Sequence, residues 1–532
     1  MNTTHIRIII ILVGWLGGCR LLAATVESDI CIYGGTSAGV IAAVQAAKLG
    51  KRVVVIESGS HLGGLTASGL GWTDIGNKDA IGGLARDYYR RLGKHYGKIE
   101  AWTFEPHVAE QEFIALLNES KTPVYFQQKL RSVKKDGVSL VEIATEAGLI
   151  FRAKMFIDAT YEGDLMAKAG VSYLVGRESN ATYGETLNGI RAKTPKNQFV
   201  VPVDPFVIAG DTNSGLLPFV QACPLGVPGD GDENVQAYNY RLCLTKNPAN
   251  RKPIQPPPNY EPSKYELLGR YFDALAAAGT PVSLRNFIKL DIVTRDKTDS
   301  NNSGGFSTDF IGMNNDYPNA NEATRAQFKA QCLDYTKGFL TYLATSPRVP
   351  ESIRTEMQQW GLCRDEFQDT DGWPNQPYVR EARRMISDYV MTEKNCRQVE
   401  VVADSVGLAA YSMDSHNCRR IIRNGKVENE GDVQVPPTAP YPISYRSIVP
   451  RAEQCQNLLV PVCLAASHIA YGSIRMEPVF MTLGQSAATA AALAIDQKVS
   501  VQKVDYRKLR DGLISDHQVL EWKSNSPTST SK

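Results

Sequence analysis

The chain has 532 residues, of which 43% are hydrophobic and 21% charged, and its 58 Lys and Arg against 56 Asp and Glu give a formal net charge of +2. A chain of this length exceeds what one hydrophobic core supports, so we expect two closely packed domains. Because the charges are interspersed and form no basic stripe, nucleic acid is excluded as an expected partner.

The first 24 residues have the pattern of a signal peptide. Arg7 precedes an apolar run over residues 8–18, which is shorter than the roughly 20 residues of a membrane-spanning helix. Cleavage near Ala24, after the small residues of "LLAA", is the favoured ending, and a lipid anchor on Cys19, after "LGGC", is the alternative. Either ending predicts an exported protein, periplasmic or secreted, and no later segment is long and apolar enough to span a membrane.

The ten cysteines show no C-x-x-C or other metal-ligand spacing. We therefore expect no metal site. In an exported chain some cysteines can form disulfides, but the sequence does not reveal their connectivity.

The mature chain opens on a strand, a glycine-rich turn, a helix and a second strand. These are "DICIY" (29–33), "GGTSAG" (34–39), "VIAAVQAAKLG" (40–50) and "KRVVVIES" (51–58). The second strand has four consecutive apolar residues, which is typical of a parallel strand buried on both faces. The pattern predicts a βαβ unit.

The turn has nearly the spacing of the G-x-G-x-x-G motif that binds a dinucleotide, with Thr36 in place of the middle glycine. The helix that follows would direct unpaired N–H groups and the positive end of its dipole at a pyrophosphate. Glu57, at the end of the second strand, can accept hydrogen bonds from the adenosine ribose, and a purely structural turn would not explain it. The residues predicted to contact the pyrophosphate are Gly34, Gly35, Thr36, Ser37, Ala38 and Gly39.

The identity of the dinucleotide follows from two features. An acidic Glu57 would repel a 2′-phosphate, so NADP is disfavoured and NAD and FAD remain. The next loop, "SGSHLGGLTASGLGWTD" (58–74), favours FAD, because a Gly-Gly pair after the second strand brings backbone close to the flavin. Gly63 and Gly64 are therefore predicted to lie along the flavin.

The rest of the first half predicts a helix, a meander and an inserted domain. Residues 105–120 place apolar side chains on one helical face, and residues 124–160 suggest a strand and a small meander with a turn at Asp136-Gly137. Residues 171–395 are richer in Pro, Asn and Gly and contain a predicted helix at 264–279. We interpret 171–395 as an inserted second domain.

The last part of the chain returns to the style of the first domain. Asn424-Gly425 predicts a hairpin. It is followed by an apolar strand at 457–465, a loop at 466–477 and a small-residue helix at 478–496. The cofactor domain is thus expected in two parts, 29–170 and 396–500, and the C-terminal segment 501–532 ends in a tail, 524–532, expected to be disordered.

Several motifs together resemble one family. They are "YGGTSAG", "ESGSHLGGLTASGLGWTD", "FIDATYEGDLMAKAGV", "NNSGGFSTDFIG", "PYVREARRM", "YSMDSHNC" and "ASHIAYGSIRMEPVFMTLGQSAATAAALA". With the others they spread over residues 29–496 and resemble the FAD-dependent oxidoreductase family of exported bacterial proteins, some of which are named xanthan lyase.

The resemblance implies an α/β fold: a Rossmann-like, glutathione-reductase-type FAD-binding domain, discontinuous in sequence, with an inserted α+β substrate domain. It implies FAD as cofactor, Asp158 at the end of the strand that re-enters the cofactor domain, and a flavin-facing helix starting near Pro478. Many relatives of this broader fold hold the ribityl chain with Gly-Asp where this chain has "LAASHIA". The resemblance therefore assigns no ribityl contact, and it implies no substrate.

Flavin chemistry needs a base for the substrate proton and a positive charge near the reduced flavin. His468, just before the flavin-facing helix, and His416, flanked by Asp414, are the candidate bases, and each can instead be a structural histidine. Arg475 is the candidate cation or substrate anchor, with an ion pair to Glu477 as the alternative. His61, in the loop near the flavin, could bond covalently to it.

The sequence thus predicts an exported FAD-dependent oxidoreductase. We expect it to oxidise a small polar substrate by hydride transfer to flavin N5, with carbohydrate-derived compounds as candidates. The sequence does not identify the electron acceptor. Two alternatives stay open: a polysaccharide lyase, and a flavin-binding protein without turnover.

Overall fold

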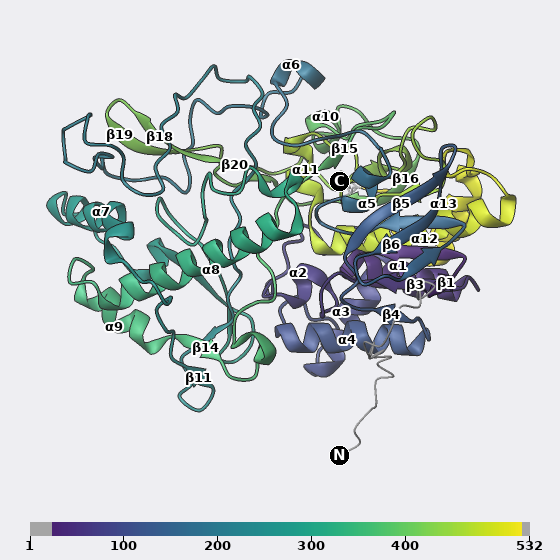
Figure 1. Cartoon of the computed structure of the whole chain (residues 1–532), viewed down its shortest axis with the longest axis horizontal. Helices are drawn as coiled ribbons and strands as arrows, with labels where there is room; N and C mark the ends of the chain where they lie inside the picture. Colours follow the sequence, from purple (N-terminus) through teal and green to yellow (C-terminus); the bar gives the residue numbers. More distant parts are fainter. Residues whose placement is uncertain (1–23, 524–532) are drawn as a thin grey trace, which may run out of the picture.

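The structure is a computed structural model that describes residues 24–523. Residues 1–23 of the expected signal peptide, with Cys19, and the tail at 524–532 lie outside the described residues. Figure 1 shows two lobes. The first combines the start and the end of the chain, in purple and yellow, and the second contains mostly the middle of the chain, in teal and green.

A five-stranded parallel sheet forms the centre of the first lobe. Its register places Tyr33 between Ile56 and Asp158, so the carboxyl ends of three strands lie side by side. In open parallel sheets, ligands bind outside this edge. The strand order is β22 (Leu458–Leu459), β8 (Met155–Asp158), β2 (Ile30–Tyr33), β3 (Val53–Ile56) and β4 (Val124–Tyr125).

The two faces of this sheet are both apolar and both covered. Ile30 and Ile32 belong to the main core with the helices, whereas Cys31 and Tyr33 pack with the residues of the meander on the opposite face. Burial on both faces explains the continuous apolar runs in the sequence. The helices are α1 (Ser37–Lys48), α3 (Gly83–His95), α4 (Pro106–Glu119) and α12 (Glu477–Gln497), and the second sheet comprises β1 (Thr25–Glu27), β7 (Ile150–Arg152), β6 (Ser139–Thr145) and β5 (Leu130–Asp136).

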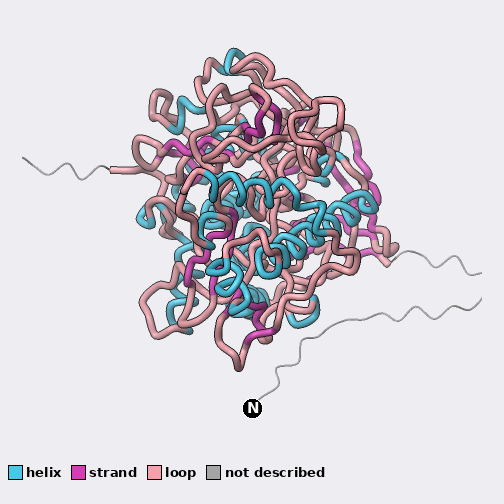
Figure 2. The backbone as a smooth tube through the Cα atoms, turned by 90° about the vertical axis from the view of Figure 1, so that its left-hand side faces the viewer, coloured by secondary structure: helices cyan, strands magenta, loops and turns pink. Residues whose placement is uncertain are grey.

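The second lobe consists of long helices, small antiparallel sheets and extended loops; loops predominate when it faces the viewer in Figure 2. Its helices are α7 (Glu266–Ala277), α8 (Glu322–Thr345) and α9 (Glu351–Gln359). Its strands are β10 (Leu244–Thr245), β14 (Gly361–Cys363), β11 (Arg251–Lys252), β12 (Ile288–Ile292) and β13 (Thr298–Asn302). The hairpin β18 (Arg419–Arg423) to β19 (Lys426–Glu430) also lies in this lobe, although it comes later in the chain.

The remaining elements are mostly short. They are α2 (Gly64–Ala67), α5 (Asp164–Lys168), β9 (Tyr173–Leu174), α6 (Asn180–Tyr183), β15 (Arg384–Met385), α10 (Glu393–Cys396), β16 (Ser405–Ala409), β17 (Met413–Ser415), β20 (Val433–Val435), β21 (Tyr441–Ser444), α11 (His468–Ile474) and α13 (Tyr506–Ser515). β17 pairs with β20 and packs against α11. The domain boundaries expected from the sequence stay predictions.

Most local expectations are confirmed. The βαβ unit, the helix within 105–120 and the helix within 264–279 are present as β2-α1-β3, α4 and α7. The hairpin turn at Asn424-Gly425 is present, and both residues have positive φ angles, 51° and 73°, as a type I′ turn requires. Between β5 and β6 the turn begins one residue later than expected, at Gly137, because Asp136 still pairs with Ser139.

Two expectations near the C-terminus are wrong. Residues 466–477 are not a loop, because α11 occupies His468–Ile474. Ser467 caps this helix by accepting a hydrogen bond from the N–H of Ala470. The apolar strand expected at 457–465 is reduced to β22, Leu458–Leu459.

The expectation that no later segment could span a membrane also needs correction. Among the described residues, α12 is long and apolar enough by composition, with a mean hydropathy of 1.3 over its most apolar window. However, 89% of that window is buried inside the protein, where the small side chains of α12 pack against α1. α12 is therefore a core helix.

Gly484 permits the close approach of α12 to α1. A Cβ atom there would lie 2.3 Å from the carbonyl oxygen of Ala38, whereas a Cβ at Gly512 of α13 would meet nothing nearer than 3.5 Å. We expect Gly484→Ala to lower the free energy of unfolding by about 2 kcal/mol through overpacking. The matched Gly512→Ala should be neutral or stabilising by up to about 1 kcal/mol. Chemical denaturation of both variants measures this, and equal stabilities would contradict the packing described.

Candidate functional site

The glycine-rich turn lies at the carboxyl end of β2 and leads directly into α1. Thr36 is the N-cap of α1: its Oγ1 accepts from the N–H of Gly39 at 3.2 Å and donates to the carbonyl oxygen of Ala159 at 2.7 Å. Gly34 has a φ of +106°, which a side chain would strain. A Cβ at Gly39 would lie only 1.9 Å from the carbonyl oxygen of Gly34. Thr36 thus ties the turn to the end of β8.

Glu57 lies beside this turn. One carboxylate oxygen accepts from the N–H of Gly35 at 2.6 Å, and the other accepts from the N–H of Gly59 at 2.6 Å. The side chain is partly exposed, so it retains acceptor capacity for a ligand hydroxyl.

The turn has the features that an adenine dinucleotide requires. The N–H groups of the first turn of α1 have no acceptor within the helix, and the helix dipole is positive there. A Cβ at Gly35 would lie 2.7 Å from Leu62 and 3.0 Å from the Glu57 carboxylate, so this narrow cradle accepts only bare backbone. The predicted residues 34–39 and Glu57 are thus brought together at one strand edge, and they fit the expected group.

The loop with Gly63 and Gly64 lies against the turn. The N–H of Gly63 donates to the carbonyl oxygen of Gly35 at 2.8 Å, and both glycines have positive φ angles, 88° and 56°. A Cβ at Gly64 would lie 2.2 Å from the hydroxyl of Tyr161, so glycine is required on packing grounds as well.

The first residue of α12 joins this loop to the C-terminal helix. The carboxylate of Glu477 accepts from the hydroxyls of Thr66 at 2.6 Å and Tyr161 at 2.9 Å. Burial raises the pKa of Glu477. Residues 34–39, the Gly63-Gly64 loop and the start of α12 are therefore contiguous in space, as the resemblance implied.

The three predicted catalytic residues meet in one buried polar network. The guanidinium of Arg475 donates to the carboxylate of Asp414 at 2.7 Å, and Asp414 lies 3.4 Å from Nε2 of His416. Nδ1 of His416 donates to Asp309 at 3.0 Å. Arg475 does not pair with Glu477, which was the alternative role considered from the sequence.

Electrostatics make His416 a strong proton acceptor. Burial raises the pKa of Asp414, but His416 and Arg475 outweigh it and lower that pKa to about 2, so the group is a carboxylate. Burial and the Arg380 guanidinium lower the pKa of His416, but Asp414 and Asp309 outweigh them, so that pKa is raised from its usual value.

His468 occupies a second, adjoining part of the network. Its Nδ1–H donates to the carboxylate of Glu381 at 2.8 Å, and its Nε2 lies 3.0 Å from the hydroxyl of Ser415. The side chain is 2% exposed, against 11% for His416. His468 is therefore held in a fixed orientation, with less access to a ligand than His416.

Tyr378 lies at the centre of this network and is not among the site residues predicted from the sequence. The ring of Tyr378 has three guanidinium groups around it, those of Arg241, Arg380 and Arg475, at 5.3, 4.9 and 5.7 Å from its centroid. Within the described part of the chain, the buried Nε atoms of Arg380 and Arg475 have no hydrogen-bond partner.

Several residues of the network lie in motifs that are visible in the sequence. Tyr378, Arg380 and Glu381 all lie in "PYVREARRM", and Asp309 lies in "NNSGGFSTDFIG". These motifs carried the resemblance, but no role was assigned to them.

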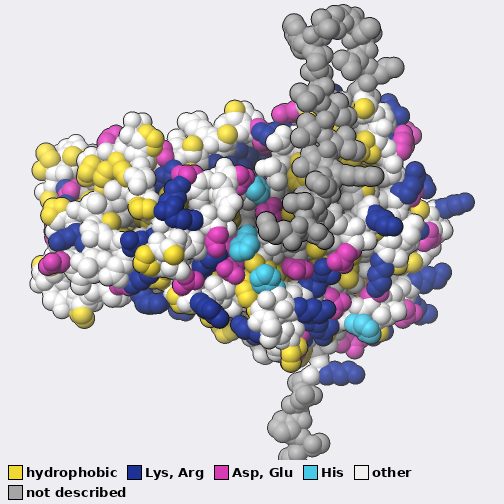
Figure 3. Space-filling view, turned by 90° about the horizontal axis from the view of Figure 1, so that it is seen from below, with side chains coloured by type: hydrophobic (Ala, Val, Ile, Leu, Met, Phe, Trp, Pro, Cys, Tyr) yellow, Lys and Arg dark blue, Asp and Glu magenta, His cyan; other side chains and the backbone are white. Residues whose placement is uncertain are grey.

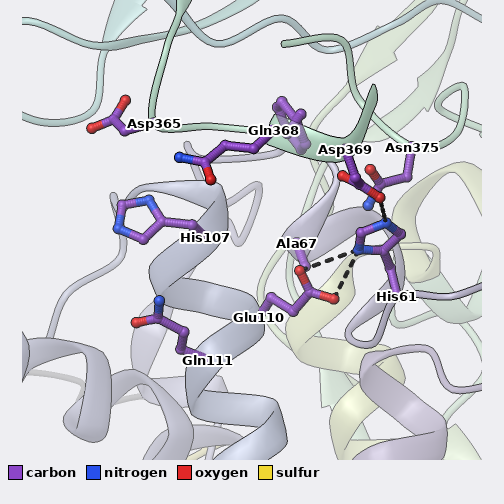
Figure 4. A pocket seen from close by; sticks show the side chains of 10 residues that line it. His61, Ala67, His107, Glu110, Gln111, Asp365, Gln368, Asp369 and Asn375 are labelled. Carbon is purple, nitrogen blue, oxygen red and sulfur yellow. Dashed lines mark hydrogen bonds and ion pairs between the residues drawn. The ribbon is translucent and has the colours of Figure 1, made fainter. Parts of the chain in front are cut away.

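His61 lies at the junction of the lobes, in a cavity of about 400 Å³ (Figure 4). Its Nδ1 contacts Glu110 at 3.0 Å and its Nε2 contacts Asp369, from the second lobe, at 2.8 Å. The hydrogen bond to Glu110 is the main cause that raises the pKa of His61 to about 9. Both ring nitrogens thus contact carboxylates, and the covalent bond to a flavin stays a prediction. Histidines and acidic side chains also gather at this junction in Figure 3.

A neighbouring cluster has ligand types suited to a metal ion. Glu105, His107 and Glu366 have potential ligand atoms within 4.8 Å of one another. However, the ammonium group of Lys297 lies 2.7 Å from both carboxylates. Lys297 thus supplies the positive charge that these carboxylates require.

Comparison with known proteins identifies one family. The family model described as FAD dependent oxidoreductase matches residues 29–513. A search of curated proteins finds no match.

Similar solved structures include thioredoxin reductase of T. acidophilum, 23% identical over 25% of this chain and 34% of that one, with a TM-score of 0.18. L-proline dehydrogenase from P. horikoshii is 18% identical over 30% of this chain and 25% of that one, with a TM-score of 0.19. p-Nitrophenol 4-monooxygenase from Pseudomonas putida is 16% identical over 31% and 51%, with a TM-score of 0.22. The chain thus matches about half or less of the length of these proteins, and the family match is the finding that bears on function.

Glu57→Ala removes the predicted acceptor for the ribose hydroxyls. The contacts of Thr36 with Gly39 and Ala159 remain and hold the turn. We expect the purified variant to retain at most about a tenth of the FAD of the unsubstituted protein, since a hydrogen bond to a charged group contributes about 1.5–3 kcal/mol. Flavin occupancy from the ratio of visible to ultraviolet absorbance, with circular dichroism as the folding check, measures this. Glu233→Ala, at an exposed loop position, is the control. Unchanged occupancy in Glu57→Ala would refute the assignment.

The contacts of His61 with Glu110 and Asp369, which we call the His61 clamp, predict that the stability of the protein depends on pH. Because the folded-state pKa, about 9, exceeds the usual 6.5, the stabilisation is complete below about pH 6.5 and is lost as the pH rises through 9. Solvent screening limits it to about 1 kcal/mol. Urea denaturation at pH 6.5 and 9.5 should therefore show a smaller loss for His61→Gln than for the unsubstituted protein. The exposed His95→Gln should behave like the unsubstituted protein, and an equal loss in all three would contradict the clamp.

Proposed function

Because this chain belongs to the FAD dependent oxidoreductase family and is an FAD-dependent oxidoreductase, we propose that it oxidises a small polar, carbohydrate-derived substrate outside the cytoplasm. The observation that carries the substrate class is the polar network around Tyr378, where buried arginines, carboxylates and His416 offer many hydrogen bonds and little apolar surface. A polyol or sugar supplies hydroxyl partners for such groups.

His416 is the proposed base. It faces Asp309 and Asp414, which orient the ring and stabilise the imidazolium that forms when it takes the substrate's hydroxyl proton. Its greater exposure favours it over His468.

The remaining residues position charge. Bound FAD supplies the two-electron acceptor for the substrate C–H bond. Arg475 lies between α11 and α12, so its fixed positive charge lies beside the start of the helix that we expect to face the flavin. His468, oriented by Glu381 and bonded to Ser415, holds β17 in place next to His416.

Export is part of the proposal. β1 begins at Thr25, directly after Ala24, and pairs with β7. Removal of residues 1–24 leaves β1 itself intact and costs only the hydrogen bond that the Ala24 carbonyl accepts from the N–H of Ile150 at 3.1 Å, so the described sheet is compatible with cleavage near Ala24 and equally with lipid attachment at Cys19. The electron acceptor is proposed to be oxygen or another compound outside the cytoplasm.

The proposed reaction is tested by adding candidate substrates to the oxygen-free holoprotein and following the visible absorbance of the flavin. We expect sugars or polyols to bleach it, and admission of oxygen or an added acceptor to restore the colour. A protein that carries flavin and is bleached only by apolar or amine substrates would contradict the substrate class. A colourless protein with lyase activity would contradict the oxidation itself.

His416→Gln should lower the rate of flavin bleaching by a factor of about 100 or more, because a general base contributes about 10²–10⁴-fold. FAD content should not change. Since the base acts when deprotonated, the rate for the unsubstituted protein should rise with pH through a value above 6.5, and this rise should be absent from the variant. Stopped-flow measurements from pH 6 to 9.5 provide the test, with His95→Gln as control; a full rate in His416→Gln would remove His416 from the mechanism.

A further inference from the structure

Cys243 and Cys363 lie opposite each other across two strands of the second lobe. β10 pairs with β14 in an antiparallel register that matches Leu244 with Leu362, so the preceding Cys243 stands opposite Cys363. Their sulfur atoms are 3.7 Å apart, and both residues are only 1% exposed. Directly opposite residues in an antiparallel pair have Cβ atoms about 4.5–5.5 Å apart, and a small approach of the two strands brings them to the roughly 3.5–4.5 Å of a disulfide.

This pair is distinct from the other cysteines of the described residues. Nowhere else in residues 24–523 do two cysteine sulfurs make a hydrogen-bond contact. Together with Phe367, the pair forms a small apolar cluster separate from the two main cores. Cys332 on α8, by comparison, is buried in the main core without a sulfur neighbour.

We propose that Cys243 and Cys363 are joined by a disulfide bond in the exported protein. In forming it, the two thiols lose two protons and two electrons, and a disulfide of an oxidising partner protein or of oxidised glutathione is reduced to two thiols. The proposal rests on export, because disulfides persist in oxidising compartments, and it does not depend on the flavin reaction.

The bond must form before the strands close. Contact with Cys363 and burial raise the pKa of Cys243 well above its usual value, so the Cys243 thiol stays protonated in the folded, reduced protein, and both sulfur atoms are shielded from solvent. Because exchange requires a thiolate and access to a disulfide, oxidation belongs to folding in the exporting compartment. Once formed, the bond is shielded from reductants by the same burial.

The bond would fix a segment that connects the two lobes. The bond closes a loop across 120 positions of the chain. A cross-link that closes a long loop restricts the unfolded chain more than one that closes a short loop. Three positions after Cys363 comes Glu366, which accepts from His107 at 2.7 Å, and three positions further comes Asp369, which contacts His61. The disulfide thereby anchors the root of the segment that binds the first lobe.

The experiment uses the full chain, produced with its own N-terminal segment and recovered from the exported fraction. The protein is denatured in N-ethylmaleimide without reductant, digested and analysed by mass spectrometry. We expect one linked pair of peptides, containing Cys243 and Cys363, and alkylation of Cys332. Free, alkylated Cys243 and Cys363 in the exported protein, or a link to another cysteine, would overturn the proposal.

Cell fractionation distinguishes a failure of export from a failure of the two cysteines to pair. If the protein stays in the cytoplasm, the pairing is tested on the denatured full chain refolded with oxidised glutathione, where absence of the Cys243 to Cys363 link overturns it equally. Flavin content and bleaching are measured separately and bear on the oxidoreductase chemistry alone.

Two variants report the stabilising effect. Cys363→Ser should leave Cys243 free to alkylate and lower the melting temperature by about 4 °C or more relative to the oxidised protein. Cys332→Ser should keep the linked peptides. If Cys363→Ser does not fold, the peptide analysis of the unsubstituted protein still decides the pairing. A melting temperature unchanged by Cys363→Ser would contradict the anchoring role.

Discussion

The start of α12 is the point on which the rest of the site depends. There the Glu477 carboxylate accepts from Thr66 of α2 and from Tyr161 in the segment after β8, while Gly63, just before α2, donates to Gly35 in the turn. Segments more than 400 positions apart in the chain are thereby held together, since Glu477 and Thr66 are separated by 411. A buried carboxylate that lost these donors would cost several kcal/mol, so the contact constrains both ends of the cofactor domain.

The charged network extends from this point into the second lobe. Asp414, on β17, lies between Arg475 at the end of α11 and His416, and His416 leads to Asp309. Each charge is buried beside an opposite one, which is the condition under which charges persist in a protein interior. Removing one member leaves its partner uncompensated, and this explains why residues from β17, α11 and the second lobe act as one unit. The His61 clamp forms a second, more exposed connection between the lobes.

The sequence predicted the parts of the site that are local. The βαβ unit, the turn at residues 34–39 and Glu57 follow from periodicity and spacing, and all lie as expected at one edge of the sheet. The helix α11 was missed because its seven residues are too short to show a helical period, and its start depends on the Ser467 cap. The partners of the predicted histidines were missed because they are distant: Asp309 lies 107 positions from His416, and Glu381 lies 87 from His468. No spacing rule relates such pairs; only the folded chain does.

The most direct test of the account is a crystal structure of the protein with its bound FAD. We expect the pyrophosphate within hydrogen-bond distance of the backbone N–H groups at the start of α1, the ribose on Glu57, and the isoalloxazine between the Gly63-Gly64 loop and the first turn of α12. A flavin bound elsewhere, with residues 34–39 free of phosphate contacts, would contradict it.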